Sequence, residues 1–383
     1  MDIDRPLPLL AGLTPHQFMK RHWQKKPLLV RAAIAPLSVP IGRGRLFELA
    51  ARDDVESRLI LRDGQRWRLR HGPFDRRALP ARKTPGWTLL VQGVDGACDA
   101  ARELLDRFRF VPDARLDDLM ISYATDGGGV GPHVDRYDVF LLQAHGQRRW
   151  RIGRQKDYAL DPDAPLKILS NFQPDQEFLL DAGDMLYLPP GWAHDGVAIG
   201  ECLTYSIGFR APEANELARE LLLRVADAHP DDPAQGRMYG DRNQPATDAP
   251  GAIPSALLAF AQQAIERALR DPQELALALG ELMSEPKPTV VFDPSPHEGA
   301  LNGPLRLDRR TRMLHGQRHV FINGEALRAS GRDARTMKLL ADQRFLTVAQ
   351  VATCSDAARA CLAEWLAAGW LHRADEENPA NEP

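Results

Sequence analysis

The sequence is poor in cysteine and has no long apolar run. Four cysteines stand among 383 residues, at positions 98, 202, 354 and 361, and none of them forms a Cys-x-x-Cys pair. This spacing excludes a disulfide-dense scaffold and favours reduced cysteines that pack as small core residues. No apolar run approaches the roughly 20 residues that a membrane-spanning helix needs. The first ten residues, MDIDRPLPLL, lack the basic segment and apolar core of a secretion signal, so we expect a cytoplasmic protein without a membrane anchor.

An excess of charge is also missing. The formal net charge is −3, with 26% charged and 44% hydrophobic residues. This balance gives the chain no overall attraction to nucleic acid or to an anionic membrane. The composition is that of an ordinary globular protein, and the length allows two or three domains.

Residues 1–210 contain short apolar runs broken by glycine, proline and aspartate. The runs are PLLVRAA (27–33), GWTLLVQGVD (86–95), DVFLLQAHGQRRWRIG (138–153) and GDMLYLPPGW (183–192). Such spacing predicts an all-β sandwich or barrel. A few helices are expected to interrupt it, the first over TPHQFMKRHW, where Thr14 and Pro15 supply an N-cap and a proline at the first helical position.

Residues 211–285 have the apolar periodicity of helices. Helical stretches are expected over 213–229, 254–270 and 271–284, with a polar connection between the first two. The apolar faces exceed what so small a domain can bury in its own core, which favours a homodimer interface. The alternative is that these helices pack back on the β-rich domain.

Residues 286–383 predict a winged-helix-like domain. A strand, an Asn-Gly turn and a strand are expected over 319–329, followed by three helical segments. The region carries 13 Lys and Arg against 12 Asp and Glu, so it lacks the basic surface of a nucleic-acid-binding module. We therefore interpret it as a structural or protein-binding domain. The polar tail, 374–383, is expected to be disordered.

The strongest chemical signal is a His-x-Asp pair formed by His133 and Asp135. On a strand, residues two apart point to the same face. The alternation continues through Tyr137, Val139 and Leu141, an apolar series that marks this face as the interior of the barrel. Two possible metal ligands are thus expected to point into the barrel.

A third candidate ligand, His194, follows in the segment DAGDMLYLPPGWAHDGVAI (181–199). Two histidines and one carboxylate form a facial triad that suits non-haem Fe(II), because it leaves neighbouring coordination positions open. Asp195 is expected to project differently and to lie behind the ligands or in solvent. The alternative is that His133 and His194 are separate hydrogen-bonded structural residues.

Arg148 is expected to be a buried cation. The chain is predicted to reverse at residues 144–147 and to return as RRWRIG, with Arg148, Trp150 and Ile152 on the core-facing side. A buried guanidinium needs an anion, and the distal carboxylate of a 2-oxo acid could supply it through two hydrogen bonds. An internal salt bridge to an aspartate or glutamate is the alternative.

A glycine-rich run at residues 127–131 precedes the His-x-Asp pair. It lacks the Gly-Lys-Ser/Thr ending of a phosphate loop and leads into a strand, which argues against a nucleotide site. These glycines are expected to permit a close approach of the backbone to the metal centre.

The segments GGGVGPHVDRYDVFLLQ…RRWRIG and LYLPPGWAHDGVA, with WQKKPL near residue 23, resemble the bacterial ribosomal oxygenases, a branch of the JmjC-type 2-oxoglutarate oxygenases. The resemblance covers essentially the whole chain. It implies an α+β protein with a double-stranded β-helix (jelly-roll, cupin-like) catalytic domain over 1–210, a helical dimerisation domain over 211–285 and a winged-helix domain over 286–383.

The resemblance also implies a cofactor set and a substrate. It assigns Fe(II) to His133, Asp135 and His194, and the 2-oxoglutarate cosubstrate to Arg148, with Ser122 and Ser206 in supporting positions and O2 as the oxidant. Ala124 stands where a hydroxyl-bearing residue would be expected. The implied reaction hydroxylates an arginine side chain of a large-subunit ribosomal protein, and Asp126, Tyr137 and Asp138 are candidates to contact that arginine.

Three other functions fit parts of the pattern. A JmjC-type oxygenase could act on RNA or on another protein, since one fold hosts many substrates. A non-enzymatic cupin-like module could bind metal without any turnover, but it would have no use for Arg148. Zinc-dependent hydrolysis is less well supported, because no general base stands beside the His-x-Asp…His set.

Overall fold

The computed structural model describes residues 2–35, 40–64, 66–227, 238–242, 245–246, 249–294 and 301–374. The chain divides into two compact units. Unit 1 comprises Met1–Ala211 with Pro288–Val291, and unit 2 comprises Pro212–Lys287 with Phe292–Pro383. All four cysteines are free, and no helix of the described residues is long and apolar enough to cross a membrane.

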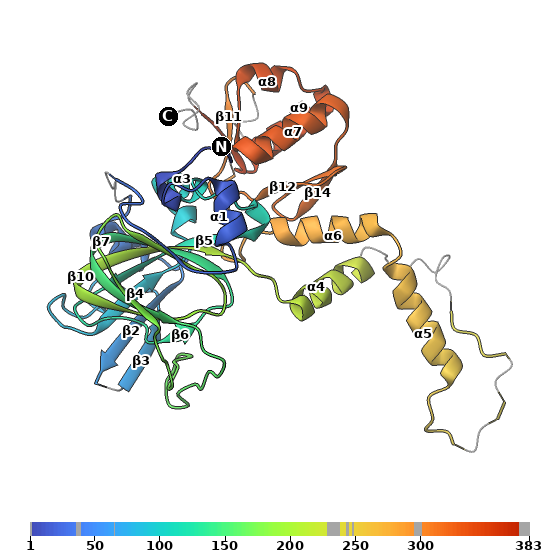
Figure 1. The fold of residues 1–383 in the computed structure, drawn as a ribbon. Helices are drawn as coiled ribbons and strands as arrows, with labels where there is room; N and C mark the ends of the chain where they lie inside the picture. Colours follow the sequence, from blue (N-terminus) through green and yellow to red (C-terminus); the bar gives the residue numbers. More distant parts are fainter. Residues whose placement is uncertain are drawn as a thin grey trace. The chain divides into compact units, whose positions relative to one another are not determined.

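Unit 1 is built on one strongly curved antiparallel sheet (Figure 1). Its strands pair in the order β1-β9-β7-β10-β5-β4-β2-β3, while β6 pairs with β10 and β8 with β7. The strands are β1 (Leu28–Val30), β2 (Ser57–Asp63), β3 (Arg66–His71), β4 (Trp87–Val91), β5 (Leu116–Ala124), β6 (His133–Val134), β7 (Asp138–Gly153), β8 (Gln176–Leu180), β9 (Met185–Leu188) and β10 (Ala193–Phe209).

Three α-helices of unit 1 cover one face of this sheet. They are α1 (Pro15–Arg21), α2 (Arg43–Leu49) and α3 (Asp99–Asp106), and short 3₁₀ helices span Pro8–Leu10, Val94–Gly96 and Asp113–Arg115. Helix α1 begins where the sequence predicts, because Thr14 and Gln17 form a reciprocal capping box around Pro15. The centroids of the Phe18 and Phe140 rings lie 5.5 Å apart, which packs α1 against β7.

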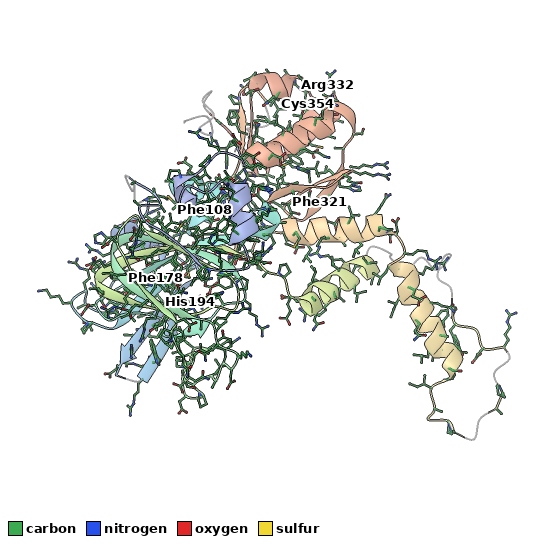
Figure 2. The ribbon with its side chains drawn as sticks, in the orientation of Figure 1. Phe108, Phe178, His194, Phe321, Arg332 and Cys354 are labelled. Carbon is green, nitrogen blue, oxygen red and sulfur yellow. The ribbon has the colours of Figure 1, made fainter. Side chains whose placement is uncertain are left out.

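The opposite, inward face of the sheet carries a second and smaller apolar cluster. Its buried members are Val139, Leu141, Trp150, Ile152, Leu180, Leu186 and Leu188. Long strands β7 and β10 therefore bury side chains on both faces, with the helices outside and the candidate site inside. Figure 2 shows His194 among the strands of this unit.

The reversal expected at residues 144–147 is wrong. Strand β7 runs on without a turn and pairs with β10 from Asp138↔Phe209 to Gly153↔Ala193. Gly146 has a φ of 64°, and the register of β10 shifts between Ile199 and Leu203, so both strands bend together at a bulge. The expected sharing of one face by Arg148, Trp150 and Ile152 is nevertheless confirmed, since all three are buried.

A continuous strand through His133 and Tyr137 is also wrong. Strand β6 ends at Val134 and β7 begins at Asp138, so Asp135 and Tyr137 lie in the connection between them. Tyr137 is 39% exposed, whereas Val139 and Leu141 are buried as expected. The break in the strand leaves one side of Asp135 accessible.

Asp138 anchors the start of β7 and does not reach any substrate mouth. It is fully buried, and its carboxylate accepts hydrogen bonds from Gln24 (3.1 Å) and Tyr187 (2.6 Å) and pairs with Arg115 (3.2 Å). Burial raises the pKa of Asp138, and these partners oppose the rise. The WQKKPL segment thus has a structural role, because Gln24 joins the N-terminal segment to β7.

Unit 2 combines helices with two small antiparallel sheets. The helices are α4 (Ala214–Asp227), α5 (Ser255–Ala268), α6 (Pro272–Ser284), α7 (Gly331–Gln343), α8 (Val348–Ala352) and α9 (Asp356–Ala367). The sheets have the orders β15-β11-β16 and β12-β13-β14, with β11 (Leu305–Leu307), β12 (Met313–His315), β13 (His319–Ile322), β14 (Glu325–Arg328), β15 (Phe345–Leu346) and β16 (Leu371–Arg373).

The predicted hairpin at residues 319–329 is confirmed. Asn323 and Gly324 both have positive φ, 50° and 90°, as a two-residue turn between β13 and β14 requires. Helix α6 packs on this hairpin, where Gly280 leaves room for the Phe321 ring (Figure 2). The boundary expected at residues 285/286 thus falls inside unit 2, and separate dimerisation and winged-helix domains stay a prediction. The disorder expected for the tail concerns residues 375–383, outside the described part.

Two glycines at the β7–β10 bend give a matched test of this geometry. A Cβ on Gly146 would lie 2.2 Å from the Glu201 carbonyl oxygen, whereas a Cβ on Gly200 (φ 68°) would meet nothing within 4 Å. Gly200→Ala should therefore cost only the left-handed backbone strain, about 1–2 kcal/mol. Gly146→Ala should lower the free energy of unfolding clearly further in urea titrations; equal losses would contradict the bulge.

Candidate metal centre

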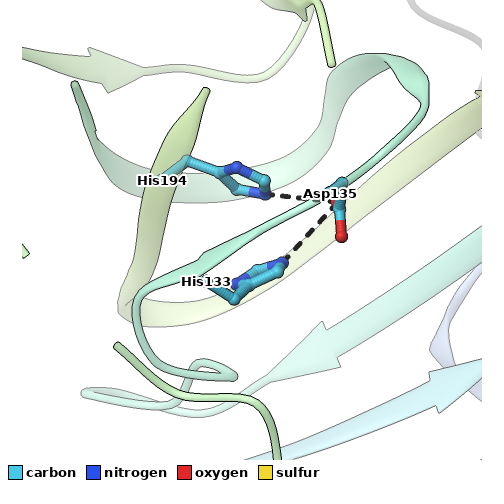
Figure 3. A group of neighbouring side chains, drawn as sticks. All are labelled: His133, Asp135 and His194. Carbon is cyan, nitrogen blue, oxygen red and sulfur yellow. Dashed lines mark ion pairs between the residues drawn. The ribbon is translucent and has the colours of Figure 1, made fainter. Parts of the chain in front are cut away.

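The structure brings the three predicted residues together at one point (Figure 3). The side chains of His133, Asp135 and His194 offer ligand atoms that all lie within 4.8 Å of one another. Asp135 Oδ2 is 3.7 Å from His133 Nε2 and 3.5 Å from His194 Nε2. Strands β6 and β10 set this arrangement, because His133 and His194 are paired in register.

Backbone carbonyls fix which nitrogen each imidazole offers. His133 Nδ1 lies 2.9 Å from the Gly131 carbonyl oxygen, and His194 Nδ1 lies 3.0 Å from that of Trp192. A carbonyl oxygen can only accept, so both rings carry their proton on Nδ1. Nε2 of each ring therefore faces Asp135, which is the nitrogen that a metal-ligating histidine offers when its Nδ1–H bonds a backbone carbonyl.

The three side chains differ in how much of their surface is exposed to solvent. His194 is 3% exposed, whereas the side chains of His133 and Asp135 are 24% and 20% exposed. Burial, followed by the neighbouring His133, lowers the pKa of His194 to about 4, against the opposing charge of Asp135. Two imidazoles that offer Nε2, one carboxylate and an accessible side fit a divalent cation that keeps open positions for exchangeable ligands.

The backbone of Asp135 is held by residues that lie outside the strands. Its carbonyl oxygen accepts a hydrogen bond from the Gly191 N–H (2.9 Å), and the Gly191 carbonyl accepts one from the Tyr158 hydroxyl (2.8 Å). Burial, followed by the nearby Asp135 carboxylate, raises the pKa of Tyr137 well above its usual value. The ring of Tyr137 is partly exposed, and its contact with a substrate arginine stays a prediction.

Arg148 is a buried cation without a partner for two of its donors. It is 4% exposed, and its Nε and Nη2 atoms make no hydrogen bond within the described residues. Its register partners are Ala198 on β10 and Leu180 on β8, neither of which can neutralise a guanidinium. The alternative of an internal salt bridge therefore has no support at these two atoms, and the arrangement suits an anionic ligand.

Ser122 and Ser206 are both buried on the inward face of the sheet. Ser122 Oγ donates to the Thr204 carbonyl at 3.4 Å, and Ser206 faces Leu141 in register on β7. Ala124 packs with Ala198 and Cys202 on the same face. The contribution of the two serines to cosubstrate binding stays a prediction.

Two of the remaining predicted positions have structural roles. Asp195 is 4% exposed and forms an ion pair with Arg151, so it supports β10 from behind the ligands and is not exposed. Asp126 is exposed, but its carboxylate accepts the Gly200 N–H at 2.8 Å. The sequence predicts Trp150 only as a core residue, although its alternation with Arg148 also places it on the wall of the site.

The glycine-rich run contacts the candidate ligand His133 through the Gly131 carbonyl and also approaches a strand closely. Gly127 and Gly128 exchange backbone hydrogen bonds with Ala198 on β10. A Cβ on Gly129 would lie 2.5 Å from the Gly196 carbonyl oxygen. The missing side chains thus let the loop pack against the strand that carries His194.

Comparison with known proteins agrees with this fold and site. Residues 103–217 match the JmjC domain family, and residues 267–372 match the ROXA-like winged helix. The Escherichia coli ribosomal protein uL16 3-hydroxylase is 33% identical over 329 residues, 83% of this chain and 86% of that protein.

Solved structures extend the similarity over the whole fold. An X-ray structure of E. coli YcfD superimposes with a TM-score of 0.84 at 29% identity, covering 94% of this chain and 98% of that chain. A structure of YcfD, a ribosomal oxygenase, in complex with cobalt and 2-oxoglutarate has a TM-score of 0.81 at 29% identity, covering 95% and 99%.

The fold and the site define a JmjC-domain protein with a cupin-like β-domain and a C-terminal winged helix. The chain belongs to the ribosomal oxygenase family, with the E. coli uL16 3-hydroxylase among its relatives. The expected α+β fold and the expected family are both confirmed.

The lowered pKa of His194 predicts how the metal-free protein responds to acid. Its imidazole should titrate near pH 4, below the ordinary 6.5, because burial disfavours the charged ring. Between these pH values His194 is protonated in the unfolded chain but not in the folded protein. Its contribution therefore lowers the free energy of unfolding as the pH falls from 6.5 to 4. Nitrogen-15 NMR of the imidazoles, assigned with His194→Gln, measures the midpoint; a value near 6.5 would contradict the buried placement.

Proposed function

We propose that this protein is an Fe(II)- and 2-oxoglutarate-dependent dioxygenase of the cytoplasm that hydroxylates an arginine side chain of a large-subunit ribosomal protein, the counterpart of uL16. The observation that carries the proposal is Arg148, which lies on the strand pair that holds His194 and whose Nε and Nη2 atoms have no partner among the described residues. A metal-storage module would not need this cation. Membership of the ribosomal oxygenase family supports the choice of substrate.

His133, Asp135 and His194 would hold the iron, and Arg148 would hold the distal carboxylate of 2-oxoglutarate. With O2, the loaded centre couples oxidative decarboxylation of 2-oxoglutarate to succinate and CO2 with hydroxylation of a C–H bond. The Gly131 and Trp192 carbonyls orient the two imidazoles so that each turns its Nε2 toward Asp135, and the burial of His194 excludes water behind it. It leaves the side of His133 and Asp135 accessible to a peptide.

The mouth of the site supports a flat, polar target. Tyr137 combines an exposed ring with a hydroxyl near Asp135, and a guanidinium can stack on such a ring. The arginine target itself rests on the resemblance of residues 121–153 and 181–199 to the ribosomal oxygenases. The winged-helix region has nearly balanced charge, and we include no nucleic acid among the expected partners.

The function is tested by anaerobic reconstitution with Fe(II) and 2-oxoglutarate, followed by air and uL16 peptides. Mass spectrometry should detect one added oxygen on an arginine, dependent on 2-oxoglutarate, and Asp135→Ala should abolish it by opening the metal site. Arg148→Ala should instead raise the KM for 2-oxoglutarate at least about tenfold while Fe(II) binding persists, because a charged hydrogen-bond pair is lost.

Each other outcome of this experiment has a definite meaning. Succinate release without peptide oxidation would keep the oxygenase and replace the substrate, with RNA and other proteins next to be assayed. Metal binding without any succinate would favour the non-enzymatic cupin-like module. Wild-type turnover by Asp135→Ala would remove Asp135 from the proposed ligand set.

We further propose a homodimer formed through α4–α6. These helices expose an unusual number of apolar side chains for a protein surface. The exposed residues are Leu222, Leu223, Leu257, Leu258, Ile265, Leu269, Leu275 and Leu279. A second copy of the same helices would cover this surface by pairing like patches about a twofold axis.

Charges placed on α5 should separate the proposed dimer. Leu258 and Ile265 are seven residues apart on one side of the helix and are 57% and 58% exposed. Sedimentation of the full chain should show a dimer that becomes a monomer in the double variant Leu258→Glu, Ile265→Glu. The control, Gln263→Glu, adds charge on the other side of α5 and should stay dimeric; a monomeric wild type would refute the proposal.

A further inference from the structure

Trp150 is a second buried donor without a partner on the inward face of β7. The residue is 4% exposed, and its indole Nε1 makes no hydrogen bond within the described part of the chain. An indole N–H can only donate, and buried donors of this kind normally have an acceptor. Its position two residues from Arg148 places three unpartnered donor atoms, Arg148 Nε and Nη2 and Trp150 Nε1, along one wall.

The indole lies between the candidate metal ligands and the guanidinium. Its ring centroid is 5.8 Å from that of His194, and the Arg148 Cζ atom is 5.7 Å from the Trp150 ring. The register repeats this order on the facing strand, where His194, Gly196 and Ala198 oppose Ile152, Trp150 and Arg148. The indole is therefore a neighbour of both the candidate ligand His194 and Arg148.

Gly196 fixes the indole in this position. A Cβ on Gly196 would lie 2.6 Å from Trp150 Cζ3, 2.7 Å from Cη2 and 2.9 Å from Cε3. The ring thus lies directly on the backbone of β10, with no room for a side chain beneath it. An indole this closely packed presents its N–H in one direction only, which is what an oriented hydrogen-bond donor requires.

We propose that the Trp150 N–H donates a hydrogen bond to an oxygen of bound 2-oxoglutarate and so positions it between the metal centre and Arg148. The inference rests on the proposed function, since it needs the keto acid as ligand. It assigns Trp150 a binding role, beyond that of an apolar core residue. The two ionised carboxylates of 2-oxoglutarate supply acceptors for the three buried donor atoms. A hydrogen bond to a charged acceptor is stronger than one to a neutral acceptor.

Trp150→Phe separates the two roles, because it keeps a ring on Gly196 and beneath Arg148 while removing the N–H. Titration calorimetry without oxygen, with Mn(II) in place of iron, measures metal binding first and 2-oxoglutarate binding second. The variant should bind Mn(II) like the wild type and 2-oxoglutarate roughly ten- to a hundredfold more weakly, from the loss of one hydrogen bond to a charged group.

A matched control uses another buried tryptophan. Trp87 is 1% exposed, and its Nε1 already donates to the Ala81 carbonyl at 3.2 Å. Trp87→Phe removes the same group from the core of unit 1 but outside the site. It should lower stability and leave the affinity for 2-oxoglutarate unchanged, which corrects for any general effect of removing an indole.

The wild-type protein supplies an independent readout that does not depend on a variant folding. The chain has seven tryptophans, so its indole N–H region holds few NMR signals. With Zn(II) in the site, addition of 2-oxoglutarate should move the Trp150 indole proton downfield as it gains an acceptor. The signal is identified by its disappearance in Trp150→Phe, or by its broadening with Mn(II) if that variant does not fold.

The outcomes distinguish the role of Trp150 from the proposed function on which it depends. A wild type that binds no 2-oxoglutarate would overturn both. A wild type that binds it, with equal affinity in Trp150→Phe and no indole shift, would refute the role of Trp150 alone. A weaker variant together with a downfield shift supports the hydrogen bond, because loss of packing would not move the wild-type signal.

Discussion

The pairing of β7 with β10 is the constraint on which the candidate site depends. One end of this strand pair brings His194 beside the metal position, and its middle faces Arg148 and Trp150 across Gly196 and Ala198. Small residues on one strand therefore leave the space that large polar residues on the other strand fill. The bend at Gly146 lets the same two strands curve around that space and still pack their outer faces against the helices.

Burial gives these groups their chemical properties. His194 loses its affinity for protons because water is excluded around it, which leaves a lone pair for a cation. The same exclusion makes the Arg148 and Trp150 donors that have no partner in the described part of the chain unfavourable without an acceptor. Cation and anion positions on neighbouring parts of one wall favour a ligand that touches both, and only the side of His133 and Asp135 remains open for a substrate.

Local patterns in the sequence predict much of this site, whereas long-range contacts decide the rest. The His-x-Asp pair, the His194 segment and the alternation at Arg148 each depend on residues close in sequence. Gly146 looks like a turn from its neighbours alone, and only the extra residues of β10 opposite it make a bulge. Asp138 was assigned to the substrate mouth by proximity, but its partners Gln24, Arg115 and Tyr187 lie far away in the chain.

The carbonyl oxygens of Gly131 and Trp192 orient both imidazoles. Two of the three candidate ligands are therefore positioned by backbone contacts that do not depend on which divalent ion is bound. A rigid nitrogen and oxygen sphere ranks divalent ions by the Irving–Williams series, in which Fe(II) stands below nickel, copper and zinc. Cellular metal supply then selects the occupant, and a preparation loaded with the wrong ion would be well folded and inert.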